Sequence, residues 1–504
     1  MAFDRGSGIL AHPTSFPGNH GIGDLGWGAS AFLDWLAAAG QRFWQVMPLV
    51  PTGLGDSPYS SVSAFAGNPL LISLDSLAAD GLLDESDLRT EFGFPSDRVE
   101  FEQVRGFKEH RLHRAFERFR AGPSVALQTE LDDFARQEAG WLDDFALFMA
   151  AKDAHGGQSW LDWDPALKRR EPEAVRRWQR ELGGNVEYHA FVQFVFRRQW
   201  NAVRAAARAR GIAVIGDIPI FVAHDSADVW ANQENFRLNA DGLPAVVAGV
   251  PPDYFSATGQ LWGNPLYDWP KIAATGYRWW ISRFANALST VDIVRIDHFR
   301  GFAAAWTVPA DAVTAASGNW EPGPGRELFD AVLNALGSLP LIVEDLGLIT
   351  EDVRELRRDL DLPGMAVLQF AFDGDAANIY LPHNFERLLV VYPGTHDNQT
   401  TRGWFDALPA GARAQVQAYI GRDGSDIAWD FIRLAMASVA DLAIVPLQDA
   451  MRLGDEARMN VPGTPNGNWS WRFRPESLDP GLANGLAELA ALYGRAVVTD
   501  SGSV

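Results

Sequence analysis

Four carboxylates in this sequence follow short apolar runs, and their spacing suggests that they act together. They are Asp217, Asp297, Glu344 and Asp397. In a barrel of parallel strands, catalytic groups lie at the carboxyl ends of the strands, where polar residues that close apolar runs are found. A single such residue could equally be a turn or helix cap, as Asp397 in Gly-Thr-His-Asp-Asn could be. Acids after the third, fourth, fifth and seventh predicted strands favour an active site.

The run that ends at Asp297 places a basic side chain, that of Arg295, beside this acid. Side chains alternate along a strand, so Ile293, Arg295 and Asp297 are expected on one face, with Val294 and Ile296 on the other. A neighbouring guanidinium favours the ionised carboxylate, which is the form that a nucleophile requires. A buried structural ion pair explains this strand equally well.

Glu344 closes the next apolar run and supplies a second carboxyl in a different environment. A glutamate in apolar surroundings at the open end of a barrel can have a raised pKa and act as a general acid. Two such carboxyls, roughly 5–5.5 Å apart, define a retaining glycosidase, in which one attacks C1 and the other moves the proton. Asp397 would add a like charge and bind sugar hydroxyls, with His396 and Asn398 as further donors beside it.

Eight short apolar runs predict the strands that position these groups. The runs cover residues 8–12, 43–48, 212–219, 291–297, 341–344, 366–372, 388–392 and 443–447. Amphipathic helical segments separate most of them, which indicates a parallel sheet that closes into a barrel. The predicted fold is therefore α/β, a (β/α)8 TIM barrel with a large helical insertion between strands 2 and 3 and further loop insertions.

The insertions divide the chain into four predicted parts. Residues 1–54 start the barrel with strands 1 and 2, and 55–210 form a mainly helical subdomain. Residues 211–447 complete the barrel with a lid-like insertion around 225–285, where Pro, Gly and aromatic residues show no clear period. Residues 448–504 supply an active-site loop and a closing helix.

Composition excludes several classes of function. The formal net charge of −21 opposes binding to nucleic acid or to an anionic membrane surface. There is no Cys, which removes thiol catalysis and disulfides, and no Lys ends a predicted strand, which argues against a lysine base or Schiff base. The first residues lack the apolar stretch of a signal peptide, and no later segment is apolar enough to span a bilayer, so we expect a cytoplasmic protein.

These motifs resemble those of the amylomaltases, the bacterial 4-α-glucanotransferases of glycoside hydrolase family 77. The likeness covers nearly the whole chain. It is carried by Val-Arg-Ile-Asp-His-Phe-Arg-Gly at 294–301, Glu-Asp-Leu-Gly at 344–347, His-Asp-Asn at 396–398, Gly-Asp-Ser-Pro-Tyr at 55–59, Gly-Asp-Ile-Pro-Ile-Phe-Val at 216–222, Pro-Asp-Tyr-Phe-Ser at 252–256 and Asn-Val-Pro-Gly-Thr at 460–464.

The resemblance implies a role for each matching residue. Asp297 would be the nucleophile, Glu344 the acid/base and Asp397 the carboxylate that stabilises the transition state. Arg295 and His396 would assist in the donor site, Ser57, Tyr59 and Asp217 would bind donor sugars, and Asp253, Tyr254 and Phe255 would cover the acceptor side. The predicted substrate-binding set also contains Asn398, His298, Trp262 and Asn468, which lie in or beside these motifs and loops.

The resemblance also implies the substrates. A maltodextrin or other α-1,4-glucan would be the donor and glucose or maltose an acceptor, with no cofactor, no metal ion and a monomer or small homo-oligomer as the working state. One position departs from the pattern, because Leu54 stands where some members of the family carry an aromatic residue for a remote glucan strand. A secondary surface site at that position is therefore not expected.

The residues alone leave three alternatives open. A hydrolytic α-amylase-type enzyme would use the same barrel and the same carboxylates, because transfer and hydrolysis share one covalent intermediate. Asp217, Glu344 and Asp397 could instead ligate Mg²⁺ in an enolase-like or isomerase barrel. A carbohydrate-binding protein without activity is the third alternative, which the intact set of acids disfavours.

Overall fold

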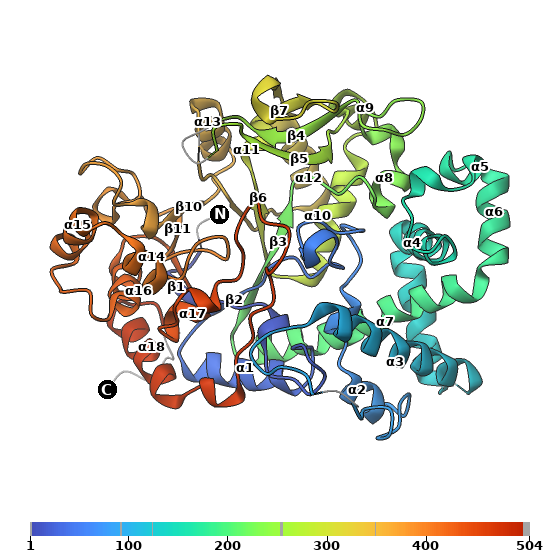
Figure 1. Ribbon diagram of the computed structural model, residues 1–504, viewed down its shortest axis with the longest axis horizontal. Coiled ribbons are helices and arrows are strands. Elements are labelled where there is room, and N and C mark those ends of the chain that lie inside the picture. The colour runs from blue at the N-terminus through green and yellow to red at the C-terminus, as the bar shows by residue number, and fades with distance from the viewer. Residues whose placement is uncertain (1–2, 91–92, 123, 253–255, 348, 497–504) are drawn as a thin grey trace.

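Eight parallel strands form the central sheet of the computed structural model, which describes residues 3–496 apart from 91–92, 123, 253–255 and 348 (Figure 1). In chain order they are β1 (Gly6–Leu10), β2 (Phe43–Gln45), β3 (Ala213–Pro219), β6 (Ile293–Asp297), β9 (Leu341–Val343), β10 (Gly364–Val367), β11 (Leu389–Tyr392) and β12 (Leu442–Pro446). The order in the sheet is β10-β11-β12-β1-β2-β3-β6-β9. At the remaining seam the N–H of Val343 donates to the carbonyl of Pro363 at 3.0 Å. The predicted (β/α)8 barrel is confirmed, and each predicted strand overlaps an observed one.

Two separate apolar clusters show which way the strand residues face. Ile293 and Ile342 belong to the cluster inside the barrel. Val294 and Ile296 belong to the larger cluster that packs against the outer helices. The alternation on β6 is the predicted one, so Arg295, which is 3% exposed, lies on the inner face.

The predicted helical insertion follows β2. It contains α2 (Leu74–Ala79), α3 (Phe101–Ala121), α4 (Val125–Ala154), α5 (Pro165–Lys168), α6 (Pro172–Glu181) and α7 (Gly183–Ala209), which Figure 1 shows on its right-hand side. Ser124 caps α4 by accepting the N–H of Leu127 at 3.2 Å, the usual role of serine at this position. Helix α7 also covers the barrel, because Trp200 packs against Trp44 with ring centroids 5.8 Å apart. The division of the chain at 54/55 and 210/211 remains a prediction.

A second, antiparallel sheet stands over the barrel beside β6 (Figure 1). Its strands are β4 (Val246–Val250), β5 (Gln260–Pro265), β7 (Ala304–Pro309) and β8 (Asn319–Pro322), in the order β5-β4-β7-β8. The sequence predicted no strands here. Most of β5 is exposed, so it lacks the period-two burial that identifies a strand from sequence.

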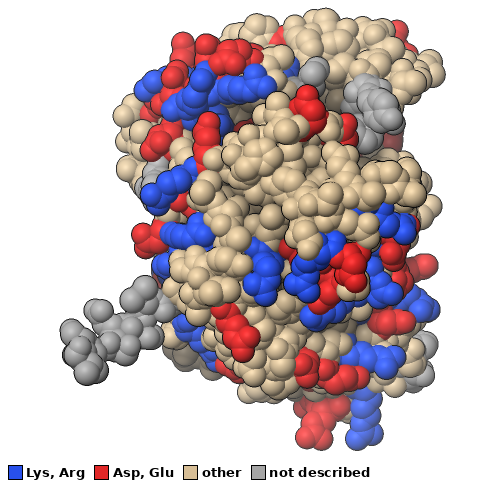
Figure 2. Space-filling view, turned by 90° about the vertical axis from the view of Figure 1, so that its left-hand side faces the viewer, with Lys and Arg blue, Asp and Glu red and all other residues tan. Residues whose placement is uncertain are grey.

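The outer helices include α1 (Trp27–Ala38), α10 (Arg278–Thr290), α12 (Arg326–Leu336), α13 (Glu351–Asp359), α14 (Thr401–Ala407), α15 (Ala410–Ile420), α16 (Ile427–Ala437) and α18 (Pro480–Leu492). Figure 2 shows the side of the molecule that carries several of the later ones, where acidic and basic side chains are interspersed around an uncharged area. Among the described residues, no helix is both long and apolar enough to cross a membrane.

Candidate active site at the carboxyl ends of the strands

The register of three neighbouring strands brings the predicted acids together. On β3 and β6, Asp217 pairs with Arg295, and Pro219 pairs with Asp297. On β6 and β9, Ile296 pairs with Val343, so the residues that follow them, Asp297 and Glu344, leave the sheet at the same level. Carboxylates from three strands therefore meet at one end of the barrel.

Arg295 joins two of these acids. Its Nη1 lies 2.5 Å from Oδ2 of Asp217 and 3.2 Å from Oδ1 of Asp297. Burial alone would lower the pKa of Arg295, but the carboxylates of Asp217 and Asp297 raise it well above its usual value. The guanidinium is therefore permanently charged, and it stabilises the ionised form of the carboxylates that it touches.

Asp217 lies deeper than Asp297 and is also bound by Tyr59. The Tyr59 hydroxyl donates to Oδ2 of Asp217 at 2.8 Å. Burial raises the pKa of Asp217 to about 6, although Arg295 acts in the opposite direction. The side chain of Asp217 is 1% exposed and that of Asp297 is 28% exposed, so Asp297 is the carboxylate of this pair that a substrate can reach.

The same geometry bears on the magnesium alternative. That alternative has Asp217, Glu344 and Asp397 as ligands, but Oδ2 of Asp217 already accepts hydrogen bonds from Arg295 Nη1 at 2.5 Å and from the Tyr59 hydroxyl at 2.8 Å. Across the described part of the chain, no group of three or more His, Asp or Glu side chains has an arrangement suited to a metal ion. The donor set at this end of the barrel thus fits an organic substrate better than a hard cation.

Glu344 is oriented by two backbone groups. The N–H of His298 donates to Oε2 at 2.8 Å, and the N–H of Leu346 donates to Oε1 at 3.0 Å. Burial, together with the charge of Asp297, raises the pKa of Glu344 to about 8, although Arg295 and the two N–H groups act against the rise. Glu344 is therefore largely protonated at neutral pH, as a general acid must be.

Asp397 is held by a loop that comes later in the chain. Asn460 Nδ2 donates to Oδ1 of Asp397 at 2.6 Å, and a guanidinium N–H of Arg458 donates to the Asp397 carbonyl at 2.9 Å. His396 Nε2 lies 3.5 Å from Oδ2. The Asp397 side chain remains 43% exposed, so it faces the open end of the barrel. No role was predicted for Asn460 or Arg458, because no periodicity links residues 458–460 to residue 397.

Aromatic rings flank these acids on two sides. Tyr59 and His396 stack with centroids 5.2 Å apart at 12°, and Trp469 lies 5.7 Å from Tyr59 and 5.9 Å from His396. On the other side, Trp262 meets His298 edge to face at 4.8 Å. Flat, partly apolar rings with a few polar groups among them are typical of a site for a small polar ligand.

Three of the predicted substrate-binding side chains are engaged in local turns. Asn398 Oδ1 accepts the N–H and the hydroxyl of Thr395 at 2.9 and 2.8 Å. Asn468 Oδ1 accepts the N–H of Val461 at 2.9 Å, and its amide donates within the same loop. Ser57 Oγ accepts the N–H of Tyr59 at 3.2 Å. These contacts shape the loops that carry His396, Trp469 and Tyr59.

The predicted acceptor-side residues Asp253, Tyr254 and Phe255 lie outside the described residues. In the sequence they fall between β4 and β5, which pair antiparallel in the second sheet.

Comparison with known proteins gives a consistent result. A family model described as 4-alpha-glucanotransferase matches residues 11–478. The 4-alpha-glucanotransferase of Synechocystis sp. is 52% identical over 501 residues and covers 99% of both chains, and that of Thermus thermophilus is 49% identical over 488 residues, covering 95% of this chain and 97% of its own. Among solved structures, the amylomaltase from Streptococcus agalactiae in complex with acarbose superposes with a TM-score of 0.94 at 39% identity, over 98% of this chain and 100% of that one. The amylomaltase from Corynebacterium glutamicum, at 19% identity and a TM-score of 0.80, shares the fold over 96% of this chain and 75% of that one.

Proposed function

Because the chain belongs to the 4-alpha-glucanotransferase family, glycoside hydrolase family 77, and is an enzyme of that class, we propose a mechanism for its reaction. The mechanism is a retaining double displacement through a covalent glucosyl–Asp297 intermediate. A segment of an α-1,4-glucan would pass from a donor maltodextrin to an acceptor sugar. One observation carries the proposal, namely the contrast between two carboxyls at the ends of neighbouring strands. Asp297 is paired with a buried guanidinium, whereas the pKa of Glu344 is raised to about 8.

In the first step, protonated Glu344 donates its proton to the glycosidic oxygen while Asp297 attacks C1. The bond between C1 and the leaving oxygen breaks, and an ester bond to Asp297 forms. Arg295 contacts Oδ1 of Asp297, which leaves Oδ2 as the attacking atom. The leaving sugar departs with the proton from Glu344.

In the second step, the Glu344 carboxylate removes the proton from an acceptor hydroxyl, and that oxygen attacks C1. The ester bond breaks, Asp297 returns to its ionised form, and Glu344 is protonated again. Glu344 thus gains and loses one proton in each cycle, which a group whose pKa is close to the working pH does most readily.

Asp397 and the rings beside it bind the sugar at the reacting carbon in this mechanism. Asp397 accepts hydrogen bonds from sugar hydroxyls, and these contacts strengthen as positive charge develops at C1. Asn460 holds the carboxylate in place through Oδ1. The stacked rings of Tyr59 and His396 would contact the donor sugar on one side. Trp262 on β5 of the second sheet and His298 after β6 would contact it on the other.

Transfer prevails over hydrolysis when the site excludes water while the ester waits for an acceptor. We assign this role to the segment around 253–255 and to residues 461–469, of which Trp469 lies 5.9 Å from His396. Glucose or maltose is the expected acceptor. The proposal includes action without a cofactor or metal ion, a cytoplasmic location, and a monomer or small homo-oligomer as the working unit.

The test is incubation of the purified protein with maltotriose and EDTA, with products resolved by chain length and both glucose and total reducing ends measured. A ladder of longer maltodextrins with glucose, at constant reducing ends, is expected. Rising reducing ends would show hydrolysis, and loss of activity in EDTA would show a metal requirement. Asp297→Asn is the matched control, which should fold normally and produce no ladder.

A further inference from the structure

A groove of about 550 Å³ lies outside the barrel, between the helical insertion and the helices that follow β3. Helix α4 supplies Trp141, α10 supplies Trp279, and α8 (Ala227–Ala231) supplies Asp228. The loop segment between β2 and α2 adds Phe65. The acids of the active site do not line it. Among the described residues it is therefore a separate surface feature.

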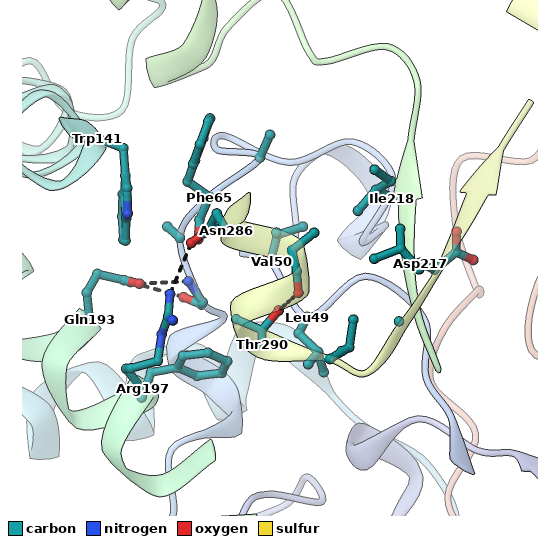
Figure 3. Close-up of a pocket in the computed structure, with 18 of the residues that line it drawn as sticks. Leu49, Val50, Phe65, Trp141, Gln193, Arg197, Asp217, Ile218, Asn286 and Thr290 are labelled. Carbon is teal, nitrogen blue, oxygen red and sulfur yellow. Dashed lines mark hydrogen bonds between the residues drawn. The ribbon is translucent and has the colours of Figure 1, made fainter. Parts of the chain in front are cut away.

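Three aromatic rings form a continuous wall of this groove. Figure 3 shows Trp141 and Phe65 beside each other. Their rings stack with centroids 6.2 Å apart at 22°, and Trp279 meets Phe65 edge to face at 6.0 Å. All three side chains are partly exposed. Trp141 and Trp279 also pack against the core, and the parts of the three rings that remain exposed are available to a ligand.

The floor of the groove carries buried polar groups. Asn235 is 6% exposed, and its side-chain amide makes no hydrogen bond to any other described residue. Asp228 is 4% exposed, and its Oδ2 accepts the N–H of Ala64 at 2.7 Å. No atom of the Asn235 side chain is both buried and without a partner, so its amide reaches the open groove, where it can exchange hydrogen bonds with a ligand hydroxyl.

This combination fits a neutral, hydroxyl-rich ligand. Aromatic rings pack against the C–H faces of pyranose rings, while an amide donates to and accepts from hydroxyl groups and a carboxylate accepts from them. Among the acids that line the groove, Glu138 pairs with Arg197 and Asp144 with Arg170. Asp228 and Glu234 disfavour an anion, and Arg278 is a basic residue of the lining. A purely apolar partner would leave Asn235 unsatisfied.

We propose that the groove lined by Trp141, Phe65, Trp279 and Asn235 binds glucosyl units of an α-1,4-glucan at a distance from the reacting bond. The ligand class rests on the proposed function. A long glucan would then be held at two places, which raises its effective concentration at the active site, whereas maltotriose would gain nothing.

The groove also borders the active-site scaffold. A small cavity of about 60 Å³ is lined by Phe65, Trp141 and Asn286 and also by Asp217 of β3. Figure 3 shows these residues around it. Asn286 Nδ2 donates to the carbonyl of Phe65 at 3.2 Å, which fixes the segment that also carries Tyr59. Glucan binding in the groove does not require this cavity. A comparison of kinetics on amylose and on maltotriose separates binding in the groove from a change at the active site.

The test uses Trp141→Ala and Asn235→Ala, with Trp27→Ala as the matched control. Trp27 is 41% exposed at the start of α1 and lies outside the groove. Electrophoretic retardation in gels that contain amylose gives the apparent Kd, and kinetics with amylose and with maltotriose give KM and kcat. We expect each groove variant to weaken amylose retention about tenfold and to raise KM for amylose. Its kcat and KM for maltotriose should equal those of the wild type.

Retention equal to that of Trp27→Ala in both groove variants would overturn the proposal. An equal loss of activity on maltotriose and amylose would also overturn it, because the residues would then act through the active site. Absence of transfer in the wild type would instead refute the proposed function. As a measurement that needs no variant, wild-type crystals soaked with maltoheptaose should show a sugar ring against Trp141 or Trp279. A sugar found only at the mouth of the barrel would contradict the proposal.

Discussion

The backbone N–H of His298 donates a 2.8 Å hydrogen bond to Oε2 of Glu344. His298 directly follows Asp297, and its φ of +54° lies in the left-handed region that non-glycine residues seldom adopt. The chain thus turns sharply after β6, and this turn aims the N–H group at the acid on the next strand. The position of one carboxyl is therefore tied to that of the other, and strain of this kind is common where a site must be held in one geometry.

The pKa of Glu344 predicts the alkaline limb of the activity profile. Because burial and Asp297 raise this pKa to about 8, kcat/KM for maltodextrins should fall as pH rises through about 8 and the proton is lost. A profile with maltotriose measures this limb. With α-maltosyl fluoride as donor the limb should disappear, since fluoride leaves without a proton. If the alkaline limb lies at the same pH with both donors, it belongs to the titration of another group.

The same shift predicts a cost in stability. Folded Glu344 titrates near 8 and the unfolded group near 4.5, so the folded state binds the extra proton between these values. The stabilisation is complete below about pH 4.5 and is lost as pH rises towards 8. Glu344→Gln should therefore unfold at a higher temperature than the wild type at pH 8, and the difference should vanish below pH 4.5. Thermal unfolding across this range decides the point, and a difference independent of pH would contradict it.

Arg295 should be essential to stability as well as to activity. Arg295→Met leaves Asp217 buried without its cation, which should lower the free energy of unfolding by about 3–5 kcal/mol. Urea unfolding measures this loss. The double variant Arg295→Met with Asp217→Asn should recover much of the stability, because the unpaired buried charge is gone, but none of the activity. Strictly additive losses would show that the two residues act independently.

Asp397 and Asn460 should affect the same kinetic parameter to different degrees. Asp397→Asn should lower kcat far more than it raises KM, because its contacts strengthen in the transition state. Asn460→Ala frees the carboxylate from its 2.6 Å hydrogen bond and should lower kcat in the same direction by about tenfold, within the range for one lost hydrogen bond to a charged group. Steady-state kinetics on maltotriose test both. A raised KM at constant kcat would assign Asp397 to ground-state binding alone.

The barrel and its acids were predictable because local sequence patterns determine them. Each apolar run predicted a strand, and the polar residue that closes it predicted the end at which the acids lie, as for Asp297 after β6. The alternation on that strand placed Arg295 correctly on the inner face. These features depend on neighbours in sequence.

The remaining features depend on contacts between distant segments. The pairing of β4 with β7 joins residues about sixty positions apart, and exposed residues on β5 leave no apolar pattern to reveal it. The hydrogen bond from Asn460 to Asp397 spans 63 positions through an irregular loop. Nothing in the local sequence distinguishes Asn468, whose amide shapes its own loop, from an asparagine that contacts a ligand.

The central claim is that Asp297 becomes covalently glucosylated, and trapping the ester tests it most directly. In Glu344→Gln, α-maltosyl fluoride can still form the intermediate, because fluoride needs no acid, but the base that activates the acceptor is missing. Intact-protein mass spectrometry should show the addition of one maltosyl group, and peptide mapping should place it on Asp297. The Asp297→Asn variant should show none. A maltosyl group on another residue, or fluoride release at the wild-type rate without any adduct, would contradict the account.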